Sequence, residues 1–213
     1  MMFTRLRLTN FKAWSDTGDL PLKPVNVLLG TNSSGKSSLI QALLLLKQTV
    51  QSPDRTIQLN LGGDEINDLF NFGDFDTVLN QAVKSPREFS IDFDFQYQRE
   101  EHFKEAKFRC IYRKNTAGAV VIHDWTLSTA EGSFRAWRRA RGAFSVGVNE
   151  ETHPRGTSRN YAPERSVALP SEAIALLGDA GPLLEDLSLA ARREFEKLVY
   201  LGPLRRKPER DYV

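Results

Sequence analysis

The sequence contains little that would point to a secreted or membrane-bound protein. Cys110 is the only cysteine among 213 residues, so no disulfide can form within the chain, which favours a reducing compartment. The N-terminal stretch MMFTRLRLTN lacks the apolar core of a signal peptide. Apolar runs such as Ala42–Leu46 are far shorter than a membrane span. We therefore expect a soluble, cytoplasmic protein with no membrane partner.

A large excess of one charge is also absent. The 29 basic and 27 acidic residues leave a formal net charge of +2, so no global field forces nucleic-acid or membrane binding. Histidine is scarce, and we expect His102, His123 and His153 to be ordinary surface or packing residues. A hydrophobic fraction of 40% is ordinary for a globular protein, and the length suits one large domain or a domain with a subdomain.

A glycine-rich motif is the strongest signal in the sequence. Gly30, Gly35, Lys36 and Ser37 match the pattern G-x-x-x-x-G-K-[ST]. The apolar run 25–29 before it predicts a buried strand, and the leucine-rich stretch 38–49 after it predicts a helix. This strand–loop–helix context predicts a loop that cradles the phosphates of a nucleotide.

The residue types in this loop match the chemistry of a triphosphate. Glycine lets the backbone N–H groups approach the anion closely, and Lys36 supplies a positive charge for the β- and γ-phosphates, so it is the candidate catalytic residue. The Ser37 hydroxyl is the expected Mg²⁺ ligand, and Ser38 is placed to touch the α-phosphate. The complete set of predicted nucleotide-binding residues is Gly30, Thr31, Asn32, Ser33, Ser34, Gly35, Lys36, Ser37 and Ser38.

The middle and end of the chain predict further elements. Strict alternation in EFSIDFDFQYQ predicts a half-buried strand, which forms an antiparallel meander with KFRCIYRK and AVVIHDWTLST, while SFRAWRRARGAFSVGV suggests another strand pair. Residues 150–168 are polar and predict a loop. Helices are expected over 171–177, with Ser171 as N-cap, and over 182–197, followed by a strand over 198–201.

The first fifty residues resemble a known family. The stretch LRLTNFKAWSDTGDLPLKPVNVLLGTNSSGKSSLIQALLLLKQT is similar to the start of the RecF/SMC/OLD-like branch of ABC-type ATPases of the AAA family. Three features carry the resemblance: a strand ending in Asn10-Phe11-Lys12, a strand pair before the loop, and Asn32 with Ser33-Ser34 inside it. The stretch LLLLKQT and the tract Tyr200–Tyr212 resemble a bacterial group linked to anti-phage defence.

The resemblance implies a fold and a cofactor. The fold is an α/β P-loop NTPase with α+β character: an ABC-type ATPase head lobe with an antiparallel β-subdomain and a helical segment. Its expected parts are residues 3–50 (strand pair, loop and first helix), 55–148 (β-rich subdomain), 149–169 (loop) and 170–213 (helices and a strand leading to a missing C-terminal lobe). The resemblance implies ATP as the nucleotide, with Mg²⁺.

Several family features are not found in the sequence. No apolar strand ends in the Asp-Glu pair that holds Mg²⁺ and orients water, and no Ser-Gly-Gly signature occurs. We therefore expect the chain to be the N-terminal portion of a longer ATPase that binds nucleotide weakly and hydrolyses little alone. A second head, either a homodimer copy or a partner lobe, would supply the missing groups so that ATP closes the dimer.

Two functions remain open. The chain is an ATP-driven head in DNA repair or anti-phage defence, beside a nuclease effector, or a degenerate nucleotide-binding module that assembles with a partner without hydrolysis. A small-molecule kinase is a weaker third option, because no acceptor-site carboxylate or lid-arginine pattern is present.

Four other features suggest binding sites but have simpler explanations. Lys12 suggests a nucleotide contact, and the acidic pair Asp92 and Asp94 suggests a metal pair, although a surface lysine and a solvated strand edge explain them better. Two basic stretches suggest contact with DNA, although a solvated hairpin and an exposed loop explain them too. Their residues are Arg135, Arg138, Arg139 and Arg141 with Phe134 and Trp137, and Arg205, Arg206, Lys207 and Arg210.

Overall fold

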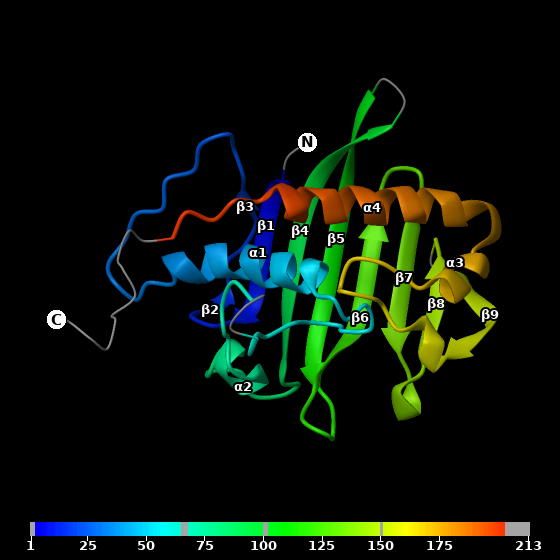
Figure 1. The fold of residues 1–213 in the computed structure, drawn as a ribbon, viewed down its shortest axis with the longest axis horizontal. Coiled ribbons are helices and arrows are strands. Elements are labelled where there is room, and N and C mark those ends of the chain that lie inside the picture. Colours follow the sequence, from blue (N-terminus) through cyan, green and yellow to red (C-terminus); the bar gives the residue numbers. More distant parts are fainter. Residues whose placement is uncertain (1–2, 65–67, 100–101, 150, 203–213) are drawn as a thin grey trace.

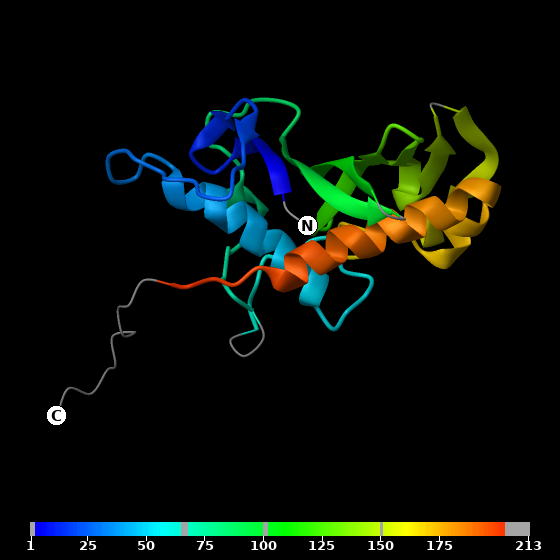
Figure 2. The ribbon, with the colours of Figure 1, turned by 90° about the horizontal axis from the view of Figure 1, so that it is seen from above.

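The chain folds around one large antiparallel sheet that carries its helices on one face (Figures 1 and 2). The computed structural model describes residues 3–64, 68–99, 102–149 and 151–202. In this part of the chain nine strands pair in the order β2-β1-β4-β5-β6-β7-β8-β9, with the short β3 also pairing with β1. The strands are β1 (Phe3–Phe11), β2 (Trp14–Asp16), β3 (Leu20–Pro21), β4 (Glu88–Arg99), β5 (His102–Lys114), β6 (Val120–Ser128), β7 (Ser133–Arg138), β8 (Phe144–Val148) and β9 (Glu151–Ser158).

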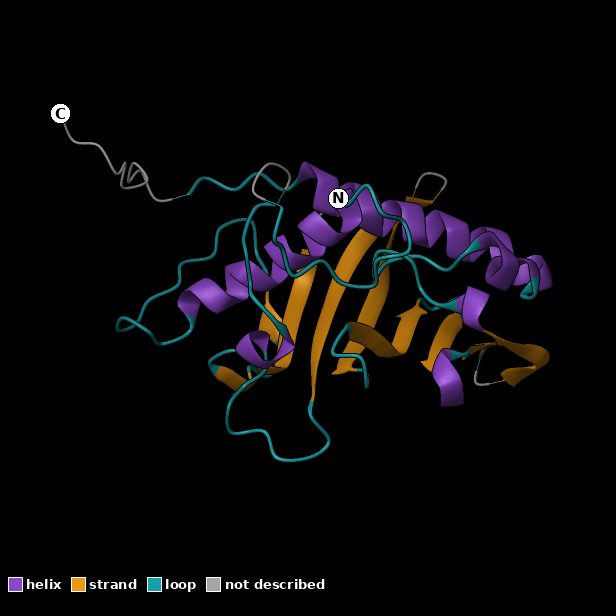
Figure 3. Cartoon of the chain, turned by 60° about the horizontal axis from the view of Figure 1, so that its bottom comes forward, coloured by secondary structure: helices purple, strands orange, loops and turns teal. Residues whose placement is uncertain are grey.

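Two long helices form the second layer, with shorter helical turns around them (Figure 3). The α-helices are α1 (Lys36–Gln51), α2 (Phe75–Val78), α3 (Ser171–Ala175) and α4 (Gly181–Lys197), and the 3-10 turns are η1 (Ala140–Gly142), η2 (Arg159–Tyr161) and η3 (Gly178–Ala180). The Lys47 ammonium on α1 donates to the carbonyl oxygens of Phe195 and Glu196 at the end of α4, at 3.2 and 3.1 Å. This contact caps the last turn of α4 and fixes α4 against α1.

The central strand β4 shows why the sheet has one covered face. Phe89, Ile91 and Phe93 alternate with polar residues, and all three side chains are fully buried under the helices. The Phe195 ring of α4 packs against Phe3 and Phe93, with centroids 5.0 and 5.2 Å apart. The predicted meander and the additional strand pair are therefore confirmed as β4, β5, β6, β7 and β8.

The polar stretch 150–168 was predicted as a loop, and that prediction is wrong for its first half. Residues 151–158 form β9, which pairs with β8 at the edge of the sheet. Pro154 is tolerated because it falls between the paired residues Thr152 and Thr157, where the register shifts, and an edge strand needs no N–H on its open side. Proline and glycine therefore did not mark a loop here.

The two C-terminal helices are found where expected, with corrections at their ends. Helix α3 begins at Ser171, but its N-cap residue is Pro170, and no side chain caps it. Residues 198–201 do not form the predicted strand: the chain is irregular there, and Val199 and Leu201 are 82% and 88% exposed. A strand requires a hydrogen-bonded neighbour, and none of the described strands lies beside this segment.

Candidate functional site

The glycine-rich loop lies at the N-terminus of α1, away from the body of the sheet (Figure 2). Gly35 is the N-cap residue and has φ 90°, a left-handed conformation that glycine adopts without strain. No side chain caps α1, and no acid occupies its first turn. The Ser38 N–H donates to the Gly35 carbonyl at 3.0 Å, and the N–H groups before it have no partner within the helix, so they create a favourable site for an anion.

The Lys36 side chain folds back over the loop. Its ammonium donates to the carbonyl oxygens of Gly30 and Thr31, at 2.8 and 2.6 Å, and lies 3.4 Å from the Ser34 hydroxyl. The charge is thus held inside the curve of the loop, next to the open helix end. An ammonium in this place can bind phosphate oxygens as the backbone N–H groups do.

Trp14 on β2 contacts the loop, and we did not predict this contact. The indole N–H donates to the Gly35 carbonyl at 3.0 Å. A Cβ at residue 35 would lie 2.7 Å from the indole nitrogen and 3.1 Å from the Ala13 Cβ, so only glycine fits. The sign of this contact in the sequence was a tryptophan shortly before the loop. The contact itself depends on the β1–β2 hairpin, which brings Trp14 to Gly35.

The apolar run before the loop was predicted to be a buried strand, and this prediction is wrong for the described chain. Residues 25–29 are irregular, and the side chains of Val25, Val27 and Leu29 are 80%, 73% and 87% exposed. The preceding segment leaves the sheet after the two-residue strand β3. A fully apolar strand needs neighbours on both sides and both faces, and the antiparallel sheet offers this run none.

A shallow, open hollow of about 590 Å³ adjoins the first turn of α1. Lys12, Ala13, Ser38 and Asn80 are among the residues that line it. The Asn80 side-chain amide donates to the Lys12 carbonyl at 2.7 Å, which holds the turn after β1. The Lys12 ammonium lies 5.1 Å from the centroid of the Phe72 ring, and burial lowers the pKa of this lysine. Lys12 is thus a half-buried side chain rather than a freely solvated one.

The remaining loop residues differ in accessibility. Ser38 is only 8% exposed, although it lines the hollow beside the first turn of α1. Ser37 is exposed in the first turn, where its hydroxyl suits a Mg²⁺ ligand. Thr31, Asn32, Ser33 and Ser34 are all exposed along the loop.

The acidic pair on β4 is engaged in ion pairs. Asp94 accepts a hydrogen bond from Arg5 at 2.7 Å, and Asp92 lies 3.2 Å from the Arg109 guanidinium and accepts from Ser90. Both carboxylates are more than nine-tenths buried, so the expected solvated edge is wrong: β4 lies inside the sheet. Burial raises the pKa of Asp92. The described residues contain no group of three or more His, Cys, Asp or Glu that could hold a metal.

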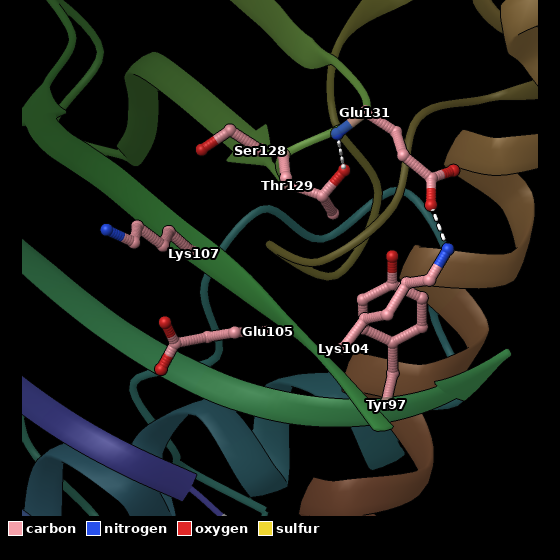
Figure 4. A pocket seen from close by; sticks show the side chains of 8 residues that line it. Tyr97, Lys104, Glu105, Lys107, Ser128, Thr129 and Glu131 are labelled. Carbon is pink, nitrogen blue, oxygen red and sulfur yellow. Dashed lines mark hydrogen bonds and ion pairs between the residues drawn. The ribbon is translucent and has the colours of Figure 1, made fainter. Parts of the chain in front are cut away.

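A larger hollow, of about 720 Å³, lies beside the extended β4–β5 hairpin (Figure 4). Lys104 pairs with Glu131 across it, and the Thr129 hydroxyl accepts from the Glu131 N–H at 3.0 Å. The Tyr97 hydroxyl is buried beside these residues without a hydrogen-bond partner. The position of this hollow on the long β4–β5 hairpin separates it from the glycine-rich loop (Figure 1).

The predicted basic sites have different outcomes. Phe134 is fully buried and cannot contact a partner, whereas Arg135 pairs with Asp124 and keeps a side chain that is 58% exposed. The tract with Arg205, Arg206, Lys207 and Arg210 lies outside the described residues. None of the helices in the described part of the chain is long and apolar enough to span a membrane.

A glycine-rich loop that opens a helix and holds a lysine inside its curve defines the P-loop class of nucleotide-binding proteins. The family model for the AAA ATPase domain matches residues 1–133, and the chain belongs to this family. No curated protein and no solved structure matches the chain. The match ends at the start of β7, so β7, β8, β9, α3 and α4 lie almost entirely beyond it.

Proposed function

We propose that the chain is the ATP-binding head of a RecF/SMC/OLD-like ATPase. The observation that carries the proposal is the Lys36 ammonium, which hydrogen-bonds the Gly30 and Thr31 carbonyls beside the uncapped start of α1. Arriving phosphates would replace these carbonyls as partners of the ammonium. ATP binding would therefore exchange internal hydrogen bonds for charge-assisted ones without rebuilding the helix.

The residues present fit ATP and Mg²⁺ in part. The loop N–H groups and Lys36 would hold the phosphates, and the Ser37 hydroxyl would bind Mg²⁺, which supplies charge neutralisation during phosphoryl transfer. The hollow lined by Lys12 and Ala13 adjoins the same helix end and would receive the nucleoside. Among the described residues, no group of three or more His, Cys, Asp or Glu could hold the metal ion by itself.

We propose that a partner head or lobe completes the site. The exposed run 25–29 leads directly into the loop and places Val25, Val27 and Leu29 in solvent. Strands from the partner would cover this run, and the partner would supply the acidic residue and signature needed for hydrolysis. ATP contacts made only in the closed dimer would then drive closure, and hydrolysis would reverse it. We place this cycle in DNA repair or anti-phage defence, beside a nuclease effector.

The test is calorimetry with Mg·ATP, with phosphate release followed in the same samples. We expect the unmodified chain to bind Mg·ATP, Lys36→Ala to bind at least about tenfold more weakly, and neither to release phosphate. Lys23→Ala, which removes an exposed lysine upstream of the loop, is the charge-matched control and should bind normally. Equal binding by Lys36→Ala would contradict the phosphate site. Phosphate release abolished by Lys36→Ala would contradict the need for a partner.

A second function, assembly on ATP without hydrolysis, is favoured by the same exposed apolar run. Such a module would use ATP only to fix the loop and the adjoining run for a partner. Sedimentation velocity with and without Mg·ATP distinguishes the two: ATP-dependent association without phosphate release, at any protein concentration, indicates the assembly module. A chain that stays monomeric with Mg·ATP instead indicates an ATPase head whose site is completed by a different partner lobe.

A further inference from the structure

Four arginines gather at the end of the sheet where β7 turns into β8 and where β9 ends. We call Arg138, Arg139, Arg141 and Arg159 the arginine cluster. Arg138 ends β7, Arg139 is the N-cap residue of the η1 turn, Arg141 lies in that turn, and Arg159 follows β9. The Arg159 guanidinium donates to the Arg141 carbonyl at 3.0 Å, which joins the two hairpins. The cluster lies beyond the 1–133 family match, so membership of the family does not account for it.

The local backbone and an aromatic ring position these side chains. Arg141 and Gly142 have φ 59° and 80°, and a Cβ on Gly142 would come within 3.0 Å of the Arg138 guanidinium. The Arg139 guanidinium lies 6.0 Å from the centroid of the Trp137 ring, and that of Arg138 lies 5.6 Å from the Phe144 ring. Stacked guanidinium groups lose less conformational freedom when they bind an anion.

The cluster lacks the acids that accompany arginines elsewhere on the sheet. The paired arginines are Arg5 with Asp94, Arg7 with Asp16, Arg109 with Asp92, Arg113 with Glu88, and Arg135 with Asp124. Among the described residues, no acid forms an ion pair with any member of the cluster. Burial, and to a smaller extent the nearby Arg159, lowers the pKa of Arg138, so a bound anion would stabilise the charged form of this side chain.

We propose that the arginine cluster binds the phosphodiester backbone of nucleic acid, without reading its sequence. Four cations from three segments converge on one end of the sheet, which suits a linear polyanion better than a single small anion. The flanking Phe144 and Trp137 rings already face arginines, so they are engaged rather than free to stack on bases. Strands β1 and β7 are four positions apart in the sheet, roughly 19 Å at the usual strand spacing, so this site is separate from the P-loop.

The test is fluorescence anisotropy with a labelled 20-base-pair duplex over a range of salt concentrations. The cluster variant carries Arg138→Gln, Arg139→Gln and Arg141→Gln. The control variant carries Arg55→Gln, Arg87→Gln and Arg193→Gln, which removes the same charge from exposed positions elsewhere. We expect the cluster variant to bind at least about tenfold more weakly, with a log–log salt slope shallower by about 2.7, because each lost phosphate contact removes about 0.9.

Three further measurements decide the proposal. Replacement of the same arginines by lysine should retain most of the affinity, which separates charge from folding, and circular dichroism melting should show all variants folded. Lys36→Ala should bind the duplex normally, so a failure of the ATP proposal leaves this one intact. The proposal is overturned if the cluster and control variants weaken equally, if the unmodified chain does not bind the duplex at low salt, or if it binds phosphatidylserine vesicles in preference to the duplex.

Discussion

The contact between Gly35 and Trp14 makes a sharp prediction about the P-loop. In Gly35→Ala, the new methyl group would lie 2.7 Å from the indole nitrogen, in a backbone conformation with φ 90°. The left-handed conformation costs about 1–2 kcal/mol for alanine, and loss of the hydrogen bond from Trp14 costs about 1 kcal/mol more. We therefore expect Gly35→Ala to lower the free energy of unfolding by about 2–3 kcal/mol and to abolish detectable Mg·ATP binding.

Gly18→Ala is the matched control for backbone strain. Gly18 has φ 63°, and a Cβ there would meet no atom within 4 Å, so this variant should lose only about 1–2 kcal/mol and bind Mg·ATP normally. Urea unfolding gives the stabilities, and calorimetry gives the affinities.

A double-mutant cycle with Trp14→Phe tests the cause of the difference. The smaller ring removes the indole nitrogen, so Gly35→Ala should cost at least about 0.5 kcal/mol less in that background than in the unmodified chain. Additive effects of the two substitutions, or equal stability of Gly35→Ala and Gly18→Ala, would show that Trp14 does not restrict residue 35.

Four other variants follow from the described contacts. Burial raises the pKa of Asp92, so the folded state holds the proton of this carboxyl to a higher pH than the unfolded chain does. Asp92 therefore lowers the stability of the folded state as the pH rises above 3.8. Asp92→Asn should be more stable than the unmodified chain, and this gain should be larger at pH 7 than at pH 4. Asp94→Asn should instead lose about 1–3 kcal/mol at pH 7, since it removes the buried partner of Arg5, and urea unfolding at both pH values separates the two. Val27→Asp should change the unfolding free energy by less than about 0.5 kcal/mol but reduce self-association in sedimentation velocity, because Val27 is 73% exposed. Tyr112→Phe should cost about 1 kcal/mol in the same unfolding assay, since it removes a 2.9 Å hydrogen bond to Ser166, and an unchanged stability would contradict that assignment.

The central sheet was predictable because its strands carry their own pattern. Phe89, Ile91 and Phe93 alternate with polar residues, and each bulky side chain is buried on the helix-covered face. The edge strand β9 was not predictable, because its polar residues and Pro154 resemble a loop and its pairing is decided by β8. The motif located the P-loop, but no local pattern indicated that Trp14 would reach Gly35 through the β1–β2 hairpin.

The failed strand prediction at 25–29 connects the fold to the proposed mechanism. Hydrophobicity alone predicted that this run is buried, but burial also needs neighbours, and the antiparallel sheet in the described chain pairs with none of these residues. The segment 198–201 presents the same combination of apolar side chains and exposure after α4. Exposed apolar side chains that lie together mark the surfaces where a partner binds. Since the first run leads into the P-loop, an element that covers it would also fix the position of Gly30, and thereby couple assembly to the binding of ATP.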